Sequence, residues 1–126
     1  MDIIEAFING EVHKVEGKVL TDELDWKEHP KFKNVFLKDY VAGKDTEYTL
    51  SCHIVRIVSG YSIGNHIHEK EVEIHQVVKG EGVCIFGDKE IAYKPGVVAI
   101  VPKGLPHSIN AKTDLYILAN FAPALR

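Results

Sequence analysis

Three histidines and a glutamate lie close together near the middle of the chain, at a regular spacing. His66 and His68 are two residues apart, and Glu73 and His75 repeat that spacing a few residues later. Side chains two residues apart on an extended strand leave the same face, so each pair can reach one point in space. Imidazole nitrogens and a carboxylate oxygen form a mixed ligand set that suits a divalent transition metal. This stretch therefore predicts a metal site.

The sequence after residue 45 has the pattern of short β-strands that could hold such a site. Runs of apolar and branched residues, such as 48–58 and 97–101, are separated by glycine and proline turns. Gly87-Asp88 is typical of a two-residue hairpin turn between strands 83–86 and 89–93. About eight short strands at this spacing predict an all-β sandwich or barrel. We expect a single small β-barrel over residues 46–126.

Residues 1–45 are mixed in pattern and form a separate N-terminal extension in this interpretation. Residues 2–8 predict a short helix that Asn9 and Gly10 end. The irregular alternation that follows is consistent with edge strands, and residues 35–41 predict a further strand. We expect this extension to supply dimer contacts.

Composition restricts the classes of function. With 126 residues the chain has room for one domain, and a net charge of -3 gives no electrostatic case for nucleic acid. The first residues lack the basic start of a signal peptide, and the longest apolar runs are too short to span a bilayer. Cys52 and Cys84 stand alone, which indicates neither a disulfide framework nor a thiolate zinc site. We therefore expect a cytoplasmic protein without nucleic-acid or membrane partners.

Two separated motifs resemble those of the cupin superfamily, and the resemblance covers about residues 50–121. The first motif is carried by Gly60, His66, His68, Glu73 and Gly80, and the second by Gly96, Pro102, Gly104 and His107. The resemblance implies a jelly-roll barrel with His66, His68, Glu73 and His107 as metal ligands. It also implies a homodimer, in which residues 1–45 could extend a sheet across the interface.

Ligand chemistry supports the same set. Four ligands without a thiolate leave two positions open if the metal is octahedral, which favours Fe, Mn, Ni or Co, although purified protein could also carry Zn. The plain alternative is that His66 and His68 are exposed strand histidines near a turn. A zincin motif is excluded because Val72, not histidine, follows His68-Glu69 at the required position.

The leading functional hypothesis is an enzyme acting on a small oxygenated organic molecule, with dioxygenase, isomerase or lyase chemistry at one metal per chain. The alternative is a non-enzymatic barrel that binds a small molecule or sugar in a metal-dependent way, as a sensor would. His75 has the strand parity of Glu73, so it should point inward. It is then either a hydrogen-bonded core histidine or an acid/base next to the ligands, and the sequence leaves both interpretations open.

Overall fold

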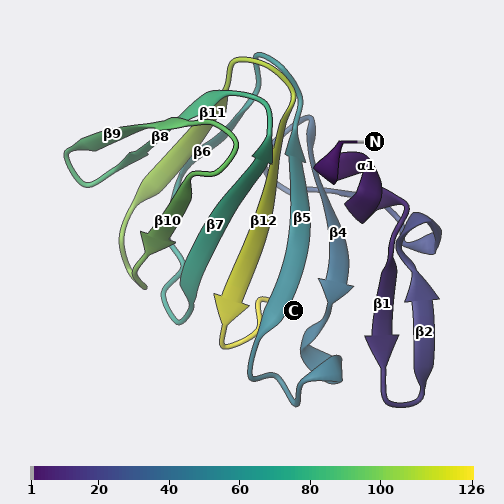
Figure 1. Cartoon of the computed structure of the whole chain (residues 1–126). Helices are drawn as coiled ribbons and strands as arrows, with labels where there is room; N and C mark the ends of the chain where they lie inside the picture. The colour runs from purple at the N-terminus through teal and green to yellow at the C-terminus, as the bar shows by residue number, and fades with distance from the viewer. Residues whose placement is uncertain (1) are drawn as a thin grey trace.

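The computed structural model describes residues 2–126, which form two facing antiparallel sheets and a separate hairpin (Figure 1). The larger sheet has the strand order β10-β7-β12-β5-β4-β3. Its strands are β3 (Lys27–Glu28), β4 (Val35–Val41), β5 (Ser51–Ile57), β7 (Val72–Lys79), β10 (Val98–Val101) and β12 (Leu115–Ala122). The smaller sheet has the order β6-β11-β8-β9 and contains β6 (Ser62–His66), β8 (Gly82–Phe86), β9 (Lys89–Tyr93) and β11 (His107–Ala111).

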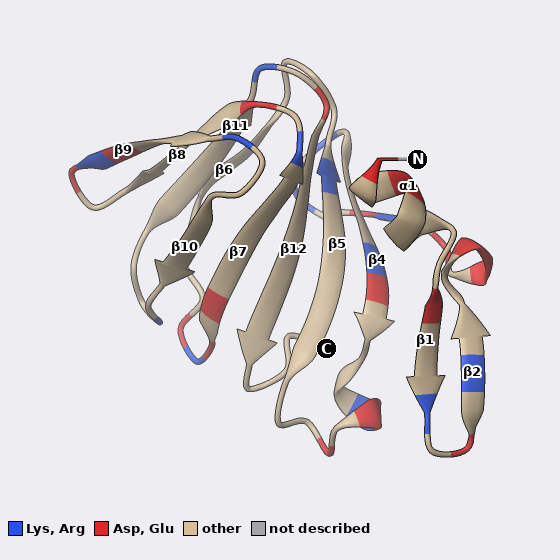
Figure 2. Ribbon diagram, viewed as in Figure 1, with Lys and Arg blue, Asp and Glu red and all other residues tan. Residues whose placement is uncertain are grey.

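The main core lies between these two sheets, because the strands alternate between buried and exposed residues. In β12 every second residue from Leu115 to Phe121 is buried, and in β7 the buried positions are Glu73, His75 and Val77. The ribbons of β6, β8, β10 and β12 carry no charged residue (Figure 2). This arrangement confirms the predicted all-β fold.

The N-terminal segment packs against the outer face of the larger sheet. Helix α1 (Ile3–Ile8) begins at Asp2, whose side chain accepts a hydrogen bond from the Glu5 amide. Strands β1 (Glu11–Lys14) and β2 (Gly17–Leu20) form the hairpin, and short 3-10 turns follow at Thr21–Glu23 and Gly43–Asp45. Ile4 joins Tyr40 and Ile54 in a second buried cluster, with Phe7 and Trp26 packed on it.

Two features of the segment 1–45 bear on the site. Strands β3 and β4 belong to the larger sheet, and Leu37 of β4 faces the central cavity. Part of this segment therefore helps to build the pocket.

No helix in residues 2–126 has the length and apolar character needed to cross a membrane.

The strand boundaries differ from the prediction in two places. The strand expected from residue 48 begins at Ser51, because Glu47 and Tyr48 have positive φ angles of 54° and 62° that do not fit a strand. Strand β6 ends at His66, so His68 lies in the following loop rather than on the same strand. The carbonyl of His68 accepts a hydrogen bond from the Gly104 amide at 2.8 Å, which ties this loop to the turn before β11.

Candidate metal centre

Four side chains from four different segments converge between the sheets. His66 ends β6 and lies opposite His107, the first residue of β11, in the strand register. Glu73 reaches in from β7 of the other sheet, and His68 reaches in from the loop that joins β6 to β7. The ligand atoms of His66, His68 and His107 all lie within 4.8 Å of one another. The structure thus brings together the four residues that the sequence predicts as ligands.

Backbone carbonyls fix the protonation of two of these rings. The Nδ1–H of His66 donates to the Gly64 carbonyl at 2.8 Å, and the Nδ1–H of His107 donates to the Leu105 carbonyl at 3.0 Å. Since a carbonyl only accepts, each neutral ring then carries its lone pair on Nε2. Histidines that bind a metal through one ring nitrogen are usually oriented by a hydrogen bond from the other nitrogen, as these two rings are.

Two buried polar atoms at the centre lack a hydrogen-bond partner among the described residues. They are Nε2 of His107 and Oε1 of Glu73, which lie 3.3 Å apart without hydrogen-bond geometry. Nε2 of His68 lies 3.7 Å from the same oxygen. Buried groups left unpaired cost free energy, and two lone pairs facing each other are stabilised by a cation between them. The donor set and its unpaired atoms therefore fit a divalent metal ion.

His75 occupies a different position in this cluster. Its Nε2 lies 2.8 Å from Oε2 of Glu73, and its Nδ1 lies 2.7 Å from the hydroxyl of Tyr93. The carboxylate only accepts, so the Nε2 nitrogen in contact with Glu73 carries the ring proton and Nδ1 accepts from the phenol. Glu73, His75 and His107 also lie close enough to form a ligand group. However, the contact with Glu73 and the hydrogen bond with Tyr93 occupy both ring nitrogens of His75, which leaves no free lone pair for a metal.

The charges of the site suit metal binding. Burial alone would raise the pKa of Glu73, but the adjacent imidazoles of His107 and His75 outweigh burial and lower it, so the carboxylate stays ionised. Burial lowers the pKa of His66 to about 4 and also lowers that of His68. Burial acts in the same direction on His107, yet the adjacent carboxylate of Glu73 raises its pKa. Two of the three imidazoles are thus neutral at neutral pH and ready to act as ligands.

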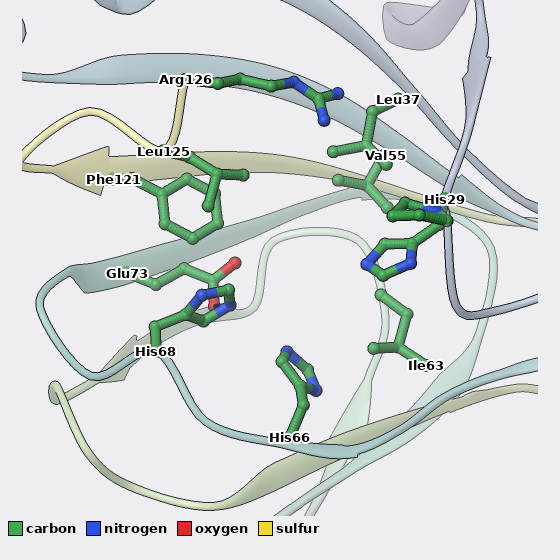
Figure 3. Close-up of a pocket in the computed structure, with 11 residues that line it drawn as sticks. His29, Leu37, Val55, Ile63, His66, His68, Glu73, Phe121, Leu125 and Arg126 are labelled. Carbon is green, nitrogen blue, oxygen red and sulfur yellow. Dashed lines mark ion pairs between the residues drawn. The ribbon is translucent and has the colours of Figure 1, made fainter.

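A cavity of about 260 Å³ opens onto the site (Figure 3). The metal side of the cavity presents His66, His68 and Glu73, and Figure 3 shows Arg126 on the opposite side. The walls between are apolar and are formed by Leu37, Val55, Ile63, Phe121 and Leu125, with His29 and Pro30 completing the lining. His75 does not line the cavity, being only 2% exposed behind Glu73. A small polar molecule could therefore approach the candidate ligands but would not touch His75.

Sequence reasoning did not single out several residues of the site. Tyr93 orients His75, and its pKa is raised by burial, so it remains a hydrogen-bond donor. His29 and Arg126 line the cavity from segments outside the two motifs. In the sequence, His29 is only one histidine in a polar connector, which does not indicate a site. No motif or spacing in the sequence indicates a functional role for Arg126.

The comparison with known families agrees with the fold. Residues 53–119, more than half of the chain, match the family described as the cupin domain, so this protein belongs to that family. Over 67 residues the chain is 39% identical to an oxalate-binding protein from Thermotoga maritima. The match covers 52% of this chain and 55% of that protein, so it spans about half of the length of the relative.

Solved structures share most of the architecture. A structure described as a predicted oxalate decarboxylase from Thermotoga maritima is 26% identical, with a TM-score of 0.75, and the match covers 83% of this chain and 97% of that one. KdgF from Halomonas sp. is 23% identical with a TM-score of 0.72, covering 82% and 92% of the two chains. Ectoine synthase from P. lautus is 19% identical with a TM-score of 0.71, covering 80% and 70%. The last two show the fold alone, and the predicted cupin jelly roll is confirmed.

Proposed function

We propose that this chain binds one divalent transition metal through His66, His68, Glu73 and His107 and acts as an enzyme on a small oxygenated organic molecule. The observation that carries the proposal is the facing pair of unpaired buried atoms, Nε2 of His107 and Oε1 of Glu73. Both belong to a cluster whose other members, His66 and His68, line a cavity. A buried unpaired pair at the base of a cavity is typical of a functional site.

The protein residues would give a bound ion a defined environment. His66 and His107 are oriented by backbone carbonyls, and Glu73 by His75, so the ligands need little rearrangement to bind. Such an ion, of Fe, Mn, Ni, Co or Zn, would supply Lewis acidity toward a carbonyl or hydroxyl oxygen. The apolar walls around it exclude water from the bound molecule. Within this proposal His75 positions Glu73 rather than exchanging protons with a substrate.

The second candidate function is metal-dependent binding without turnover. It is favoured by the relative from Thermotoga maritima, which is named an oxalate-binding protein. A small cavity with a metal at one end could hold an oxygen-rich ligand equally well in a sensor or carrier. The two candidates share the metal centre and differ only in whether the bound molecule reacts.

Metal analysis tests the centre that both candidates need. We expect about one transition metal per chain, measured by inductively coupled plasma mass spectrometry on protein purified without an affinity tag. His66→Ala and His107→Ala should each lose it, whereas His13→Ala, which alters an exposed histidine of β1, should retain it. Absence of metal from wild type after reconstitution would contradict the proposal. Oxygen uptake or product formation from small oxo and hydroxy acids would then separate enzyme from binder.

A homodimer in the cytoplasm belongs to the same proposal. Strand β10 is at the edge of the larger sheet and exposes Val98 and Ile100, next to exposed Ile74 of β7. An apolar edge of this kind needs a cover in solution, and a second copy would supply one. Sedimentation of wild type and of a chain lacking residues 1–20 would show whether the N-terminal segment contributes to the dimer.

A further inference from the structure

The chain segment after β12 folds back over one end of the cavity. Its backbone is held by the Leu125 amide, which donates to Ser51 Oγ at 2.9 Å, and by the Arg126 carbonyl, which accepts from the Gly43 amide at 2.6 Å. These contacts lie on β5 and on the turn after β4, so the segment is attached to the larger sheet. As a result, the side chains of Leu125 and Arg126 become part of the cavity wall.

A chain of hydrogen bonds fixes the guanidinium of Arg126. Its Nη2 lies 3.1 Å from Oδ1 of Asp39, and its Nε lies 3.2 Å from Oδ2. The same carboxylate accepts from Nδ1–H of His53 at 2.7 Å, and Nε2 of His53 accepts from the Ser51 hydroxyl at 2.8 Å. This leaves Nη1 of Arg126 without a partner among the described residues.

The sequence of contacts from Ser51 through His53 to Asp39 has the order of a hydrolase triad, but it cannot act as one. Ser51 and His53 are both completely buried, so no substrate reaches the hydroxyl. Ser51 Oγ already accepts from the Leu125 amide while it donates to His53. The network therefore serves to hold Asp39, and through Asp39 to hold Arg126.

Cationic side chains outnumber acidic ones around Arg126. Asp39 pairs with Arg126 and also meets Lys27 Nζ at 3.4 Å, so these three side chains carry one net positive charge. Asp39 itself does not line the cavity, and Glu73 is the one acidic residue among the described residues that do. A divalent ion would more than neutralise Glu73, which leaves a cavity that attracts anions at both ends.

His29 adds a second donor to the cavity wall. Its Nδ1 accepts a hydrogen bond from the Lys31 amide at 3.0 Å, so the neutral ring carries its proton on Nε2. Burial lowers the pKa of His29, and the charges of Arg126 and Lys31 lower it further, which keeps the ring neutral. The cavity wall thus offers an N–H group from the His29 imidazole in addition to the guanidinium of Arg126, and both are suited to a carboxylate.

We propose that Arg126 determines specificity by binding the carboxylate of a small organic acid whose other oxygen atoms face His66, His68 and Glu73. This inference rests on the proposed function, because the metal centre is to hold the second end of the same molecule. A volume of about 260 Å³ is below the roughly 300–1,000 Å³ typical of pockets for drug-sized ligands, which restricts the ligand to a small acid. Suitable ligands are short dicarboxylates and 2-oxo or 2-hydroxy acids.

Calorimetric titration with malonate and with its uncharged counterpart malonamide tests this inference. Arg126→Gln, loaded with the same metal as wild type, should bind malonate about 10- to 100-fold more weakly, which is the effect of losing a charge-assisted contact. Malonamide affinity and metal content should stay the same. Arg56→Gln is the matched control, because Arg56 pairs with Asp114 and does not line the cavity. Arg126→Lys should fall between wild type and Arg126→Gln, since it keeps the charge and loses the planar fork.

The outcomes separate this inference from the proposed function. Equal malonate affinity in wild type and folded Arg126→Gln would overturn the inference and leave the metal centre intact. The inference would also be overturned if wild type bound neither malonate nor oxalate. Wild type without metal would overturn the proposed function instead, and the same pair of titrations on the metal-free protein would still decide whether Arg126 binds the acid. Circular dichroism of each variant confirms that the compared proteins are folded.

Discussion

His75 and Glu73 lie two residues apart on β7, and Nε2 of His75 lies 2.8 Å from Oε2 of Glu73. Because this contact occupies one carboxylate oxygen, only Oε1 is left to face His107 and His68. The hydroxyl of Tyr93 in turn holds His75 at Nδ1. A ligand carboxylate with one oxygen tied and one unpaired is oriented to bind a metal through a single oxygen.

Loss of the Tyr93 hydroxyl should therefore weaken metal binding without removing any ligand. Tyr93→Phe leaves Nδ1 of His75 buried and unpaired, which should cost about 1–3 kcal/mol of stability. Metal affinity should fall by roughly 10- to 100-fold, the usual effect of removing an outer hydrogen bond of a ligand. Competition with a chelating dye measures the affinity.

Tyr61→Phe provides the control for this prediction, because Tyr61 is 38% exposed and lies outside the cluster. It should leave metal affinity unchanged. If Tyr93→Phe binds metal as tightly as wild type, the phenol has no part in orienting Glu73 through His75.

Local spacing made the ligand set predictable from the sequence. His66 and His68 flank one strand end, and Glu73 begins the next strand, so their convergence follows from a single turn. His107 could be added only through the resemblance of the second motif. The short strands separated by glycine and proline turns likewise predicted an all-β fold, which the two sheets confirm.

The supporting residues could not be predicted because they come from distant parts of the chain. Tyr93 is 18 residues from His75, and Arg126 is 87 residues from Asp39. Each contact depends on how one strand or turn sits against another across the fold, which local pattern does not encode. The position of His68 beyond the end of β6 was missed for the same reason, since it depends on the bond from Gly104.

Metal binding should release at most about one proton per chain near neutral pH, not three, and that proton comes from His107. Burial lowers the pKa values of His66 and His68, so both are already neutral, while Glu73 raises that of His107 and keeps it protonated to higher pH. Affinity should then fall by about tenfold per pH unit as the pH drops below the pKa of His107. A steeper loss is expected only near pH 4, where His66 takes up a proton.

Titration calorimetry in buffers of different ionisation enthalpy counts these protons. His13→Ala should release the same number as wild type, because His13 lies on the exposed β1 strand. Release of two or three protons near pH 7 would mean that His66 and His68 are charged in the metal-free protein.

Gly80 and Gly96 should respond differently to alanine, although both have positive φ angles of 89° and 95°. A Cβ at Gly96 would meet nothing within 4 Å, so Gly96→Ala carries only the backbone strain of roughly 1–2 kcal/mol. A Cβ at Gly80 would collide with the backbone carbonyl oxygen of Asp114. Gly80→Ala should therefore lose clearly more stability in urea unfolding. Equal losses would show that the turn at Asp114 moves aside freely.

Acid should weaken the attachment of the C-terminal segment through Asp39. Hydrogen bonding to His53 is the main cause that lowers the pKa of Asp39, and Arg126 lowers it further against the opposing effect of burial. A carboxyl group whose pKa is depressed on folding stabilises the protein above its unfolded pKa of about 3.9, and this contribution is lost as the pH falls through the folded value.

The stability difference between wild type and Asp39→Asn should thus be constant from pH 7 to about pH 5 and should shrink steadily below about pH 4. Urea unfolding of metal-free protein between pH 7 and pH 2.5 measures it without interference from metal release. Asp88→Asn, which alters an exposed turn, should differ from wild type by the same small amount at every pH. A wild-type advantage over Asp39→Asn that stays unchanged down to pH 2.5 would mean that the carboxylate is not ionically paired with Arg126. The charge assigned to the cavity wall would then have to be revised.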